Sequence, residues 1–279
     1  MISMKMMKPM IAGTVAVAAL AGTAGTASAE PWWKRFYFRA GVARVAPLEQ
    51  SRELELADVD GAASLAVMNG PIAGSGGAIN SATIVAGSLG YRLKALGGRL
   101  SLETVLGLPF TVKFSATGTL ANESIAPTAL GIPTGVEALG PELGEAKAVP
   151  PILTAVYQII NTGAVRPYVG AGVSVLIATE AKITNPILSE VSQPDFTIDP
   201  APGFVAQAGV DARLWKSVYA RIDVKFIAGM LARAEVRNAQ VRTPALPLFD
   251  TVEVGTAKMS MWVNPLIVQA GVGFDFTMF

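Results

Sequence analysis

Runs of apolar residues recur along the chain at intervals that suit β-strands. Each run is rich in Val, Ile, Leu, Phe, Thr and Gly, and turn-forming residues separate the runs. The runs hold ten or more residues, whereas strands of globular proteins usually hold about five or six. The pattern predicts eight strands, over residues 36–47, 79–93, 99–115, 147–160, 165–179, 203–214, 218–235 and 257–279.

The connections between these runs alternate strictly between long and short. Long polar or Gly- and Pro-rich stretches follow the first, third, fifth and seventh runs, whereas only residues 94–98, 161–163 and 215–217 lie in the other connections. An outer-membrane barrel alternates in this way because its periplasmic turns are short and its extracellular loops long. The chain therefore predicts an all-β fold: an eight-stranded antiparallel transmembrane β-barrel with short periplasmic turns and long extracellular loops.

Alternation within the seventh run indicates a barrel wall. Every second residue from Val218 to Ala228 is apolar, whereas the intervening set carries Arg221, Asp223 and Lys225. A strand places these two sets on opposite faces. The apolar face is expected to meet lipid, because a Lys or Arg at the membrane midplane costs about 2 to 4 kcal/mol.

The first 29 residues have the three parts of an export signal. Lys5 and Lys8 give a positive start, residues 11–20 form an apolar stretch, and an A-x-A site ends at Ala29. We expect a cleaved signal peptide over residues 1–29 and a single barrel domain over residues 30–279. The expected location is the outer membrane of a Gram-negative bacterium.

Composition excludes several classes of protein. The chain has no His and no Cys, so a Ser-His-Asp triad, a disulfide and a thiolate metal site are all excluded. Its net charge is only +1, which gives no basic footprint for nucleic acid. The sequence predicts no catalytic residues, no metal, no cofactor and no nucleic-acid partner, and a protein that is not an enzyme.

Several segments resemble the OmpW family of small outer-membrane barrels. The resemblance lies in Arg39-Ala40-Gly41 with Pro47, in residues 149–152, 166–173 and 203–211, and in residues 264–265 with 271–276. It covers most strands in the expected order. The resemblance implies passage of small hydrophobic molecules across the outer membrane, with lateral release into it.

The end of the chain departs from that pattern. Members of the family usually end at the aromatic residue that Phe276 matches, whereas this chain continues through Thr277, Met278 and Phe279. Either Phe276 or Phe279 is therefore expected to be the terminal aromatic through which the C-terminal strand meets the outer-membrane assembly machinery.

The inward-facing positions predict a lumen that is charged at one end and apolar at the other. A barrel of about eight strands is filled by its own side chains, and buried charges of both signs are expected to pair. The expected periplasmic charged plug is Arg92, Arg99, Glu103, Asp211, Arg213, Arg221, Asp223, Lys225 and Asp275. The expected apolar lumen residues, towards the outside, are Ile227, Leu231, Leu176 and Ile267.

Prolines within the runs are candidates for an opening in the wall. Proline has no N–H to donate to a ladder, so it weakens strand pairing. The candidates are Pro109, Pro150, Pro151 and Pro265. Strand-end or bulge positions explain them equally well.

These features predict an apolar pocket that admits small hydrophobic molecules from outside and releases them sideways into the membrane. The expected partners are small hydrophobic solutes, outer-membrane lipids and lipopolysaccharide. The alternative is a structural anchor or adhesin whose extracellular loops bind a partner, although those loops hold few aromatic residues. A general porin is excluded because eight strands are too few for an aqueous channel.

Two charged groups in the long loops allow further interpretations. Clustered carboxylates suit Ca²⁺, but a solvated acidic loop explains Glu53, Glu55, Asp58 and Asp60 as well. Three arginines near the outer rim could meet lipid phosphates or simply be solvated: Arg233, Arg237 and Arg242.

Overall fold

The computed structural model describes residues 31–246 and 250–276. The described residues from Trp32 onward belong to one compact unit. The expected signal peptide and Phe279 lie outside the described residues. Among the described residues, no helix is both long and apolar enough to cross a membrane.

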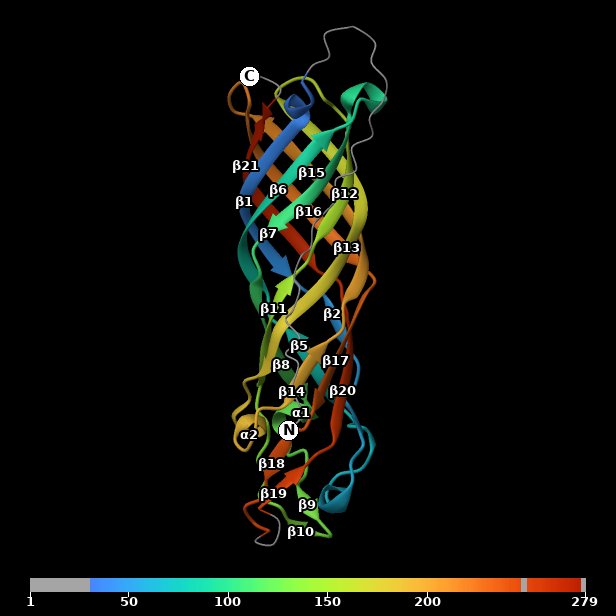
Figure 1. Cartoon of the computed structure of the whole chain (residues 1–279), viewed down its shortest axis with the longest axis vertical. Helices are drawn as coiled ribbons and strands as arrows, with labels where there is room; N and C mark the ends of the chain where they lie inside the picture. The colour runs from blue at the N-terminus through green and yellow to red at the C-terminus, as the bar shows by residue number, and fades with distance from the viewer. Residues whose placement is uncertain (1–30, 247–249, 277–279) are drawn as a thin grey trace, which may run out of the picture. The chain divides into compact units, whose positions relative to one another are not determined.

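Eight antiparallel strands close into a barrel (Figure 1). They are β1 (Phe36–Ala46), β6 (Ala82–Arg92), β7 (Leu100–Gly107), β12 (Ile152–Gln158), β13 (Val165–Ile183), β15 (Ala201–Arg213), β16 (Val218–Ala228) and β21 (Leu266–Asp275). The ladder runs β12-β7-β6-β1-β21-β16-β15-β13, and the β12–β13 pairing closes it. The expected fold class is confirmed.

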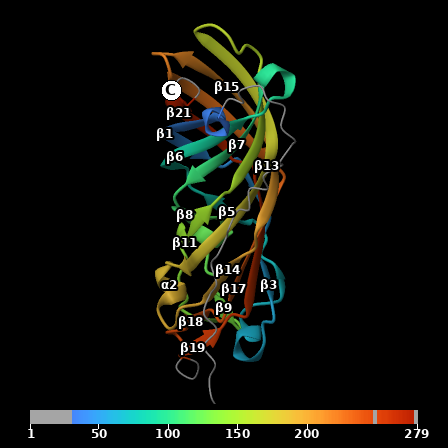
Figure 2. The same ribbon diagram turned by 45° about the horizontal axis from the view of Figure 1, so that its top comes forward.

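Beyond the long-loop end of the barrel the wall continues as an extension of two sheets (Figure 2). One joins the outer half of β13 to β11 (Glu142–Val149), β8 (Phe110–Gly118) and β5 (Ser75–Ile79). The other joins β14 (Asp195–Ile198), β17 (Met230–Arg237), β20 (Thr256–Val263), β3 (Glu55–Ala57) and β4 (Gly70–Pro71), and β2 (Glu49–Ser51) pairs with β20.

Short elements complete the chain at its two ends. The outer part of the extension carries η2 (Gly61–Leu65), α1 (Thr119–Asn122), β9 (Thr128–Ala129), β10 (Ile132–Pro133), α2 (Pro186–Ser189), β18 (Gln240–Arg242) and β19 (Thr251–Glu253), and of these β9 and β10 lie farthest from the barrel. The short-turn end of the barrel carries η1 (Trp32–Arg35) and η3 (Ala95–Gly98).

Four of the eight runs expected to form single strands are each divided into two strands in the structure. The runs 99–115, 147–160, 218–235 and 257–279 were expected to be continuous, but they break at Leu108-Pro109, at Pro150-Pro151, at Gly229 and at Asn264-Pro265. Proline cannot donate to a ladder, and Gly229 has a φ of 82°, which is left-handed backbone that glycine adopts at little cost. The breaks separate the barrel from the extension.

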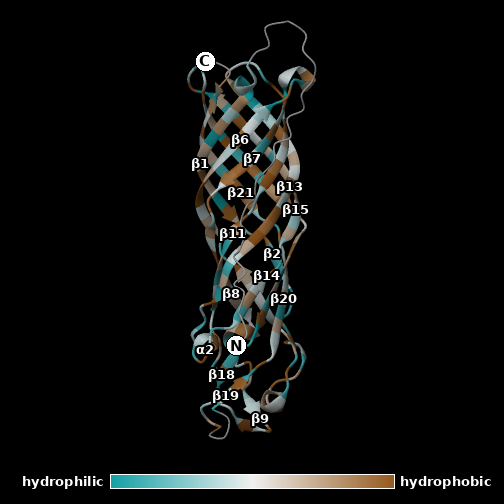
Figure 3. Cartoon of the chain, in the orientation of Figure 1, coloured by the Kyte–Doolittle hydropathy of each residue, from teal (hydrophilic) through white to brown (hydrophobic). Residues whose placement is uncertain are grey.

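Polarity alternates along the barrel strands (Figure 3). In β16, Tyr219, Arg221, Asp223, Lys225 and Ile227 are buried inside. Apolar side chains cover the outer face, where Val42, Val85, Phe204 and Ile222 are each more than half exposed. An apolar outer band is what a lipid-facing wall requires.

Candidate functional site: an apolar lumen closed by buried charges

A charge network crosses the lumen near the short-turn end. Its centre is Glu103 on β7, which is 1% exposed. Arg39 Nη1 on β1 donates to Glu103 Oε2 at 2.6 Å, and Arg221 on β16 donates to both carboxylate oxygens at 3.0 and 3.1 Å. One carboxylate therefore ties three separate strands together across the barrel.

The other carboxylates complete the balance of charge. Asp211 on β15 accepts from Arg39, and Asp223 accepts from Arg221 at 2.9 Å and from Lys225. Three cations and three carboxylates are thus paired, as buried charges require.

A second ion cluster lies between the first and the short-turn end. Asp275 on β21 accepts from Arg92 at 2.7 Å, and Arg166 lies 3.8 Å away. The guanidinium of Arg166 also stacks on the Tyr219 ring, 4.8 Å from its centroid. Together the two clusters fill this half of the lumen.

The expected plug residues divide into two groups. Arg92, Glu103, Asp211, Arg221, Asp223, Lys225 and Asp275 are brought together in these clusters. Arg213 is exposed and Arg99 is only half-buried, because each lies at a strand end beside a turn, so both belong to the rim.

Sequence reasoning missed two arginines and two tyrosines of the network. Arg39 and Tyr37 lie on the inward face of β1, and Arg166 and Tyr168 lie on that of β13. Tyr168 Oη donates to Asp223 at 2.8 Å. Tyr37 and Arg39 are two positions apart on one strand, as are Arg166 and Tyr168 on another, so each pair shares one face of its strand. This spacing was the signal that could have indicated their inward position.

An apolar cavity of about 110 Å³ lies next to the network, on the side that faces the extension. Lys225 and Gln269 form part of its floor. Its apolar lining comes from every barrel strand except β15 and includes Val45, Ile84, Val105, Ile152, Leu176, Ile227 and Ile267, together with Phe110, Met230 and Val263 of the extension. Three of the four expected lumen residues line it: Leu176, Ile227 and Ile267.

Leu231 does not line this cavity. The break at Gly229 shifts the alternation by one residue, so Met230 and Ala232 point inward instead. Met230 is 1% exposed and packs with Ile227. Leu231 lies opposite Trp262 on β20, and neither of these two residues lines the cavity.

Around Leu108-Pro109, in the wall beside this cavity, the hydrogen-bonded pairing of neighbouring strands is interrupted. The β6–β7 ladder ends at the pair Ala86–Gly107, and the β7–β12 ladder ends at Thr104–Leu153. Pairing resumes only at Phe110–Ala148, between β8 and β11. In this fully described stretch, residues 105–109 have no ladder partner on the β12 side, and residues 82–85 have none on the β7 side.

The candidate prolines differ in their surroundings. Pro109 lies within the unpaired stretch, and Pro150 faces it and lines the cavity. The carbonyl of Pro151 accepts from Val175, and that of Pro265 accepts from Ile227. Pro151 and Pro265 therefore lie where neighbouring strands remain bonded.

A second apolar cavity of about 110 Å³ continues outward into the extension. Phe114 lines both cavities. Its ring meets that of Phe196 edge to face, with centroids 5.7 Å apart. This pair therefore lies where the linings of the two cavities meet.

The described carboxylates of the long loops are not gathered into a cluster of metal-ligating groups. Among the described residues no group of three or more carboxylates could hold an ion, and Glu53 instead accepts from the Gly74 amide at 2.8 Å. Arg237 pairs with Glu235 and Arg242 with Glu190, whereas Arg233 is exposed.

The closed antiparallel barrel, its apolar outer band and its filled lumen define a small integral protein of the outer membrane. The family model described as OmpW family matches residues 80–276. The chain belongs to the OmpW family, which confirms the resemblance seen in the sequence. Its location is accordingly the outer membrane of a Gram-negative bacterium, where its apolar wall contacts the membrane lipids.

Relatives and a solved structure agree with this assignment. The dibenzothiophene metabolism operon proteins PahQ of Pseudomonas aeruginosa and DoxH of Pseudomonas sp. (strain C18) are each 24% identical over 182 residues, which is 65% of this chain and 67% of theirs. The crystal structure of OprG from Pseudomonas aeruginosa superposes with a TM-score of 0.62 at 20% identity, over 86% of this chain and 94% of that one. It supports the fold.

Proposed function

We propose that the protein admits small hydrophobic molecules into the apolar lumen and releases them sideways into the outer membrane. The observation that carries this proposal is the apolar cavity, which lies between a closed charge network and an unpaired stretch of wall. An apolar solute cannot follow the lumen through paired buried ions, because it offers them no compensating contacts. The solute would instead leave the cavity through the unpaired wall at Leu108-Pro109.

The surroundings of the unpaired stretch support an exit into lipid. Val85 and Leu108 on the outer face are 74% and 80% exposed. Ile84, Val105 and Pro150 line the cavity behind them. A solute leaving there passes from one apolar surface to another.

The names of the relatives agree with an apolar cargo. PahQ and DoxH are named for the metabolism of dibenzothiophene, a neutral compound of three fused rings. A lumen lined by aliphatic residues suits neutral hydrocarbons and similar heterocycles better than ions.

Two further partners belong to the proposal. The extension would stand within the lipopolysaccharide layer, with exposed cations on its wall such as Lys113 and Lys147. The assembly machinery would recognise the C-terminal strand β21, which carries the outward aromatic Phe274 and is followed directly by Phe276.

The two neighbours Met230 and Leu231 give a matched test of the lumen. Met230→Asp places a carboxylate in the cavity, whereas Leu231→Asp places the same charge next to it but outside. We expect decane uptake by intact cells to fall to the empty-vector level with Met230→Asp and to stay near wild type with Leu231→Asp. Assembly of each barrel is checked by its heat-dependent shift in gel mobility.

Equal uptake by cells with the wild type, with Met230→Asp and with empty vector would overturn the proposal, provided that both expressed barrels are assembled. The anchor or adhesin function would then be the better account, and the loops would become the part to test.

A further inference from the structure

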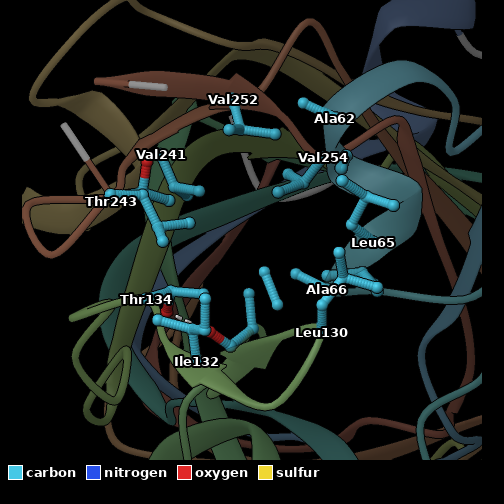
Figure 4. A pocket seen from close by; sticks show the side chains of 15 residues that line it. Ala62, Leu65, Ala66, Leu130, Ile132, Thr134, Val241, Thr243, Val252 and Val254 are labelled. Atoms are coloured by element: carbon cyan, nitrogen blue, oxygen red, sulfur yellow. Dashed lines mark hydrogen bonds between the residues drawn. The ribbon is translucent and has the colours of Figure 1, made fainter. Parts of the chain in front are cut away.

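A third apolar cavity lies at the far end of the extension (Figure 4). Its volume is about 220 Å³, twice that of the lumen cavity. Elements far apart in the sequence enclose it: η2, β9, β10, β18 and β19. Its lining is Ala62, Ala63, Leu65, Ala66, Val67, Ala126, Ala129, Leu130, Ile132, Thr134, Val241, Thr243, Leu246, Val252 and Val254. We call it the tip cavity.

The lining of the tip cavity offers few polar partners to water. Among the described residues, its lining holds no charged side chain, and Thr134 and Thr243 are its only polar side chains. Thr134 is 0% exposed and its Oγ1 donates to the Ala126 carbonyl, so it makes its hydrogen bond within the protein. A water molecule needs two to four polar partners to occupy a cavity, and this lining provides few.

The lining is also exposed where it reaches the surface. Leu130 is 78% exposed, Ile132 is 56% exposed and Leu65 is 44% exposed. The strands β9 and β10, which flank Leu130, lie at the end of the extension farthest from the barrel (Figure 1), so membrane lipid is not expected to cover this surface. A contiguous apolar surface in contact with water marks a place where something apolar binds.

Apolar linings connect this cavity to the lumen. Val254 lines both the tip cavity and the second cavity of the extension. Phe114 lines both that second cavity and the lumen cavity. Three apolar spaces therefore follow one another from the tip to the charge network.

We propose that the tip cavity is a capture site for one small, neutral, apolar molecule. A dry aliphatic cavity of about 150 Å³ binds benzene, so this larger cavity suits a compact molecule of one or two rings. The inference rests on the proposed function, because capture at the tip contributes to uptake only if the lumen then accepts the solute.

Methyl NMR of the full barrel in lipid nanodiscs, titrated with naphthalene, tests the two sites separately. We expect saturable shifts at Ala66, Leu130 and Ile132 for the tip, and at Ile227 and Ile267 for the lumen. Ala66→Phe, which fills the tip cavity from a half-buried position, should remove the saturable shifts at Leu130 and Ile132. It should leave those of the lumen.

Two further variants keep the test decisive. Ala73→Phe adds the same bulk at an exposed position that lines none of the three cavities, and it should leave every shift unchanged. Leu65→Asn makes the mouth polar without filling the cavity and should weaken binding at the tip. This variant keeps the test decisive if Ala66→Phe disturbs the local fold.

The outcomes separate the inference from the proposed function. Saturable lumen shifts without tip shifts in the wild type would overturn the capture site and leave the transport proposal intact, and so would tip shifts that survive both Ala66→Phe and Leu65→Asn. Tip shifts without lumen shifts would support binding at the tip and contradict passage to the lumen. No saturable shift at either place would overturn both.

Discussion

At the scale of single residues, the closure of the lumen depends on tyrosines that lie flat against the wall. A Cβ at Gly90 would lie 1.9 Å from the Tyr37 ring, and one at Gly209 would lie 2.2 Å from Tyr168 Oη. Each ring therefore needs a glycine beside it. In that position Tyr37 and Tyr168 contact the Arg39 and Arg221 guanidiniums and hydrogen-bond to Glu103 and Asp223 respectively.

Glu103→Ala is expected to destabilise the barrel strongly. It would remove the acceptor shared by Arg39 and Arg221 and leave two buried cations with a single remaining partner each, Asp211 and Asp223. Removing one partner of a buried ion pair costs about 3 to 5 kcal/mol. Urea unfolding in lipid vesicles, followed by tryptophan fluorescence, measures the change in the free energy of unfolding.

Glu180→Ala is the matched control. It breaks the ion pair of Glu180 with Lys147, whose side chains are 66% and 46% exposed, and exposed pairs contribute at most about 1 kcal/mol. A loss for Glu103→Ala no larger than that of Glu180→Ala would mean that water enters the plug and replaces the carboxylate.

At the scale of the strand, one glycine decides which side chains face the cavity. Outward residues of β16 include Ile222, Val224 and Phe226. After Gly229 the inward residues are Met230 and Ala232, where uninterrupted alternation would have placed 231 and 233. The strand keeps its direction while its faces exchange.

Single-cysteine variants can map this exchange, since the chain has no native Cys. With nitroxide labels at each position from 222 to 233, we expect high exposure to lipid or solvent at 222, 224 and 226, low exposure at 230 and 232, and higher exposure again at 231 and 233. The expected cause is the left-handed Gly229 backbone. Continued even-numbered exposure through 232 would contradict the shift.

The sequence was sufficient for the fold class, but not for the breaks that divide four of the expected strands and not for every site residue. Period-two alternation and loop lengths predict the eight strands, and Arg221, Asp223, Lys225 and Ile227 follow from alternation within one strand. Leu231 was misplaced because a single residue of irregular backbone reverses all later positions. The pairing of Glu103 with Arg39 and Arg221 joins residues 64 and 118 positions apart, which no local pattern can specify.

At the scale of the whole molecule, buried ion pairs close the barrel along its axis, whereas its wall lacks ladder pairing around Leu108-Pro109. Arg39, Glu103 and Arg221 link β1, β7 and β16 across the lumen, so an opening along the axis would break several buried ion pairs at once. The stretch around Leu108-Pro109 has no such bonds to break. We therefore expect that opening the wall there needs less free energy than opening the lumen along its axis.

A disulfide across that stretch should therefore block release. Val85 and Leu108 come next after the paired residues Ala86 and Gly107, so Val85→Cys with Leu108→Cys would extend the β6–β7 ladder covalently. We expect decane uptake by cells to fall when this pair is oxidised and to recover on reduction, because the strands can no longer separate.

The control joins Val42→Cys to Val85→Cys, two outward residues already paired in the β1–β6 ladder, and should show no redox dependence. If both pairs leave uptake unchanged when oxidised, the solute exits elsewhere and the unpaired stretch is only a bend in the wall. If both reduce it equally, the loss reflects stiffening of the whole barrel. Only a loss confined to the first pair places the exit between β6 and β12.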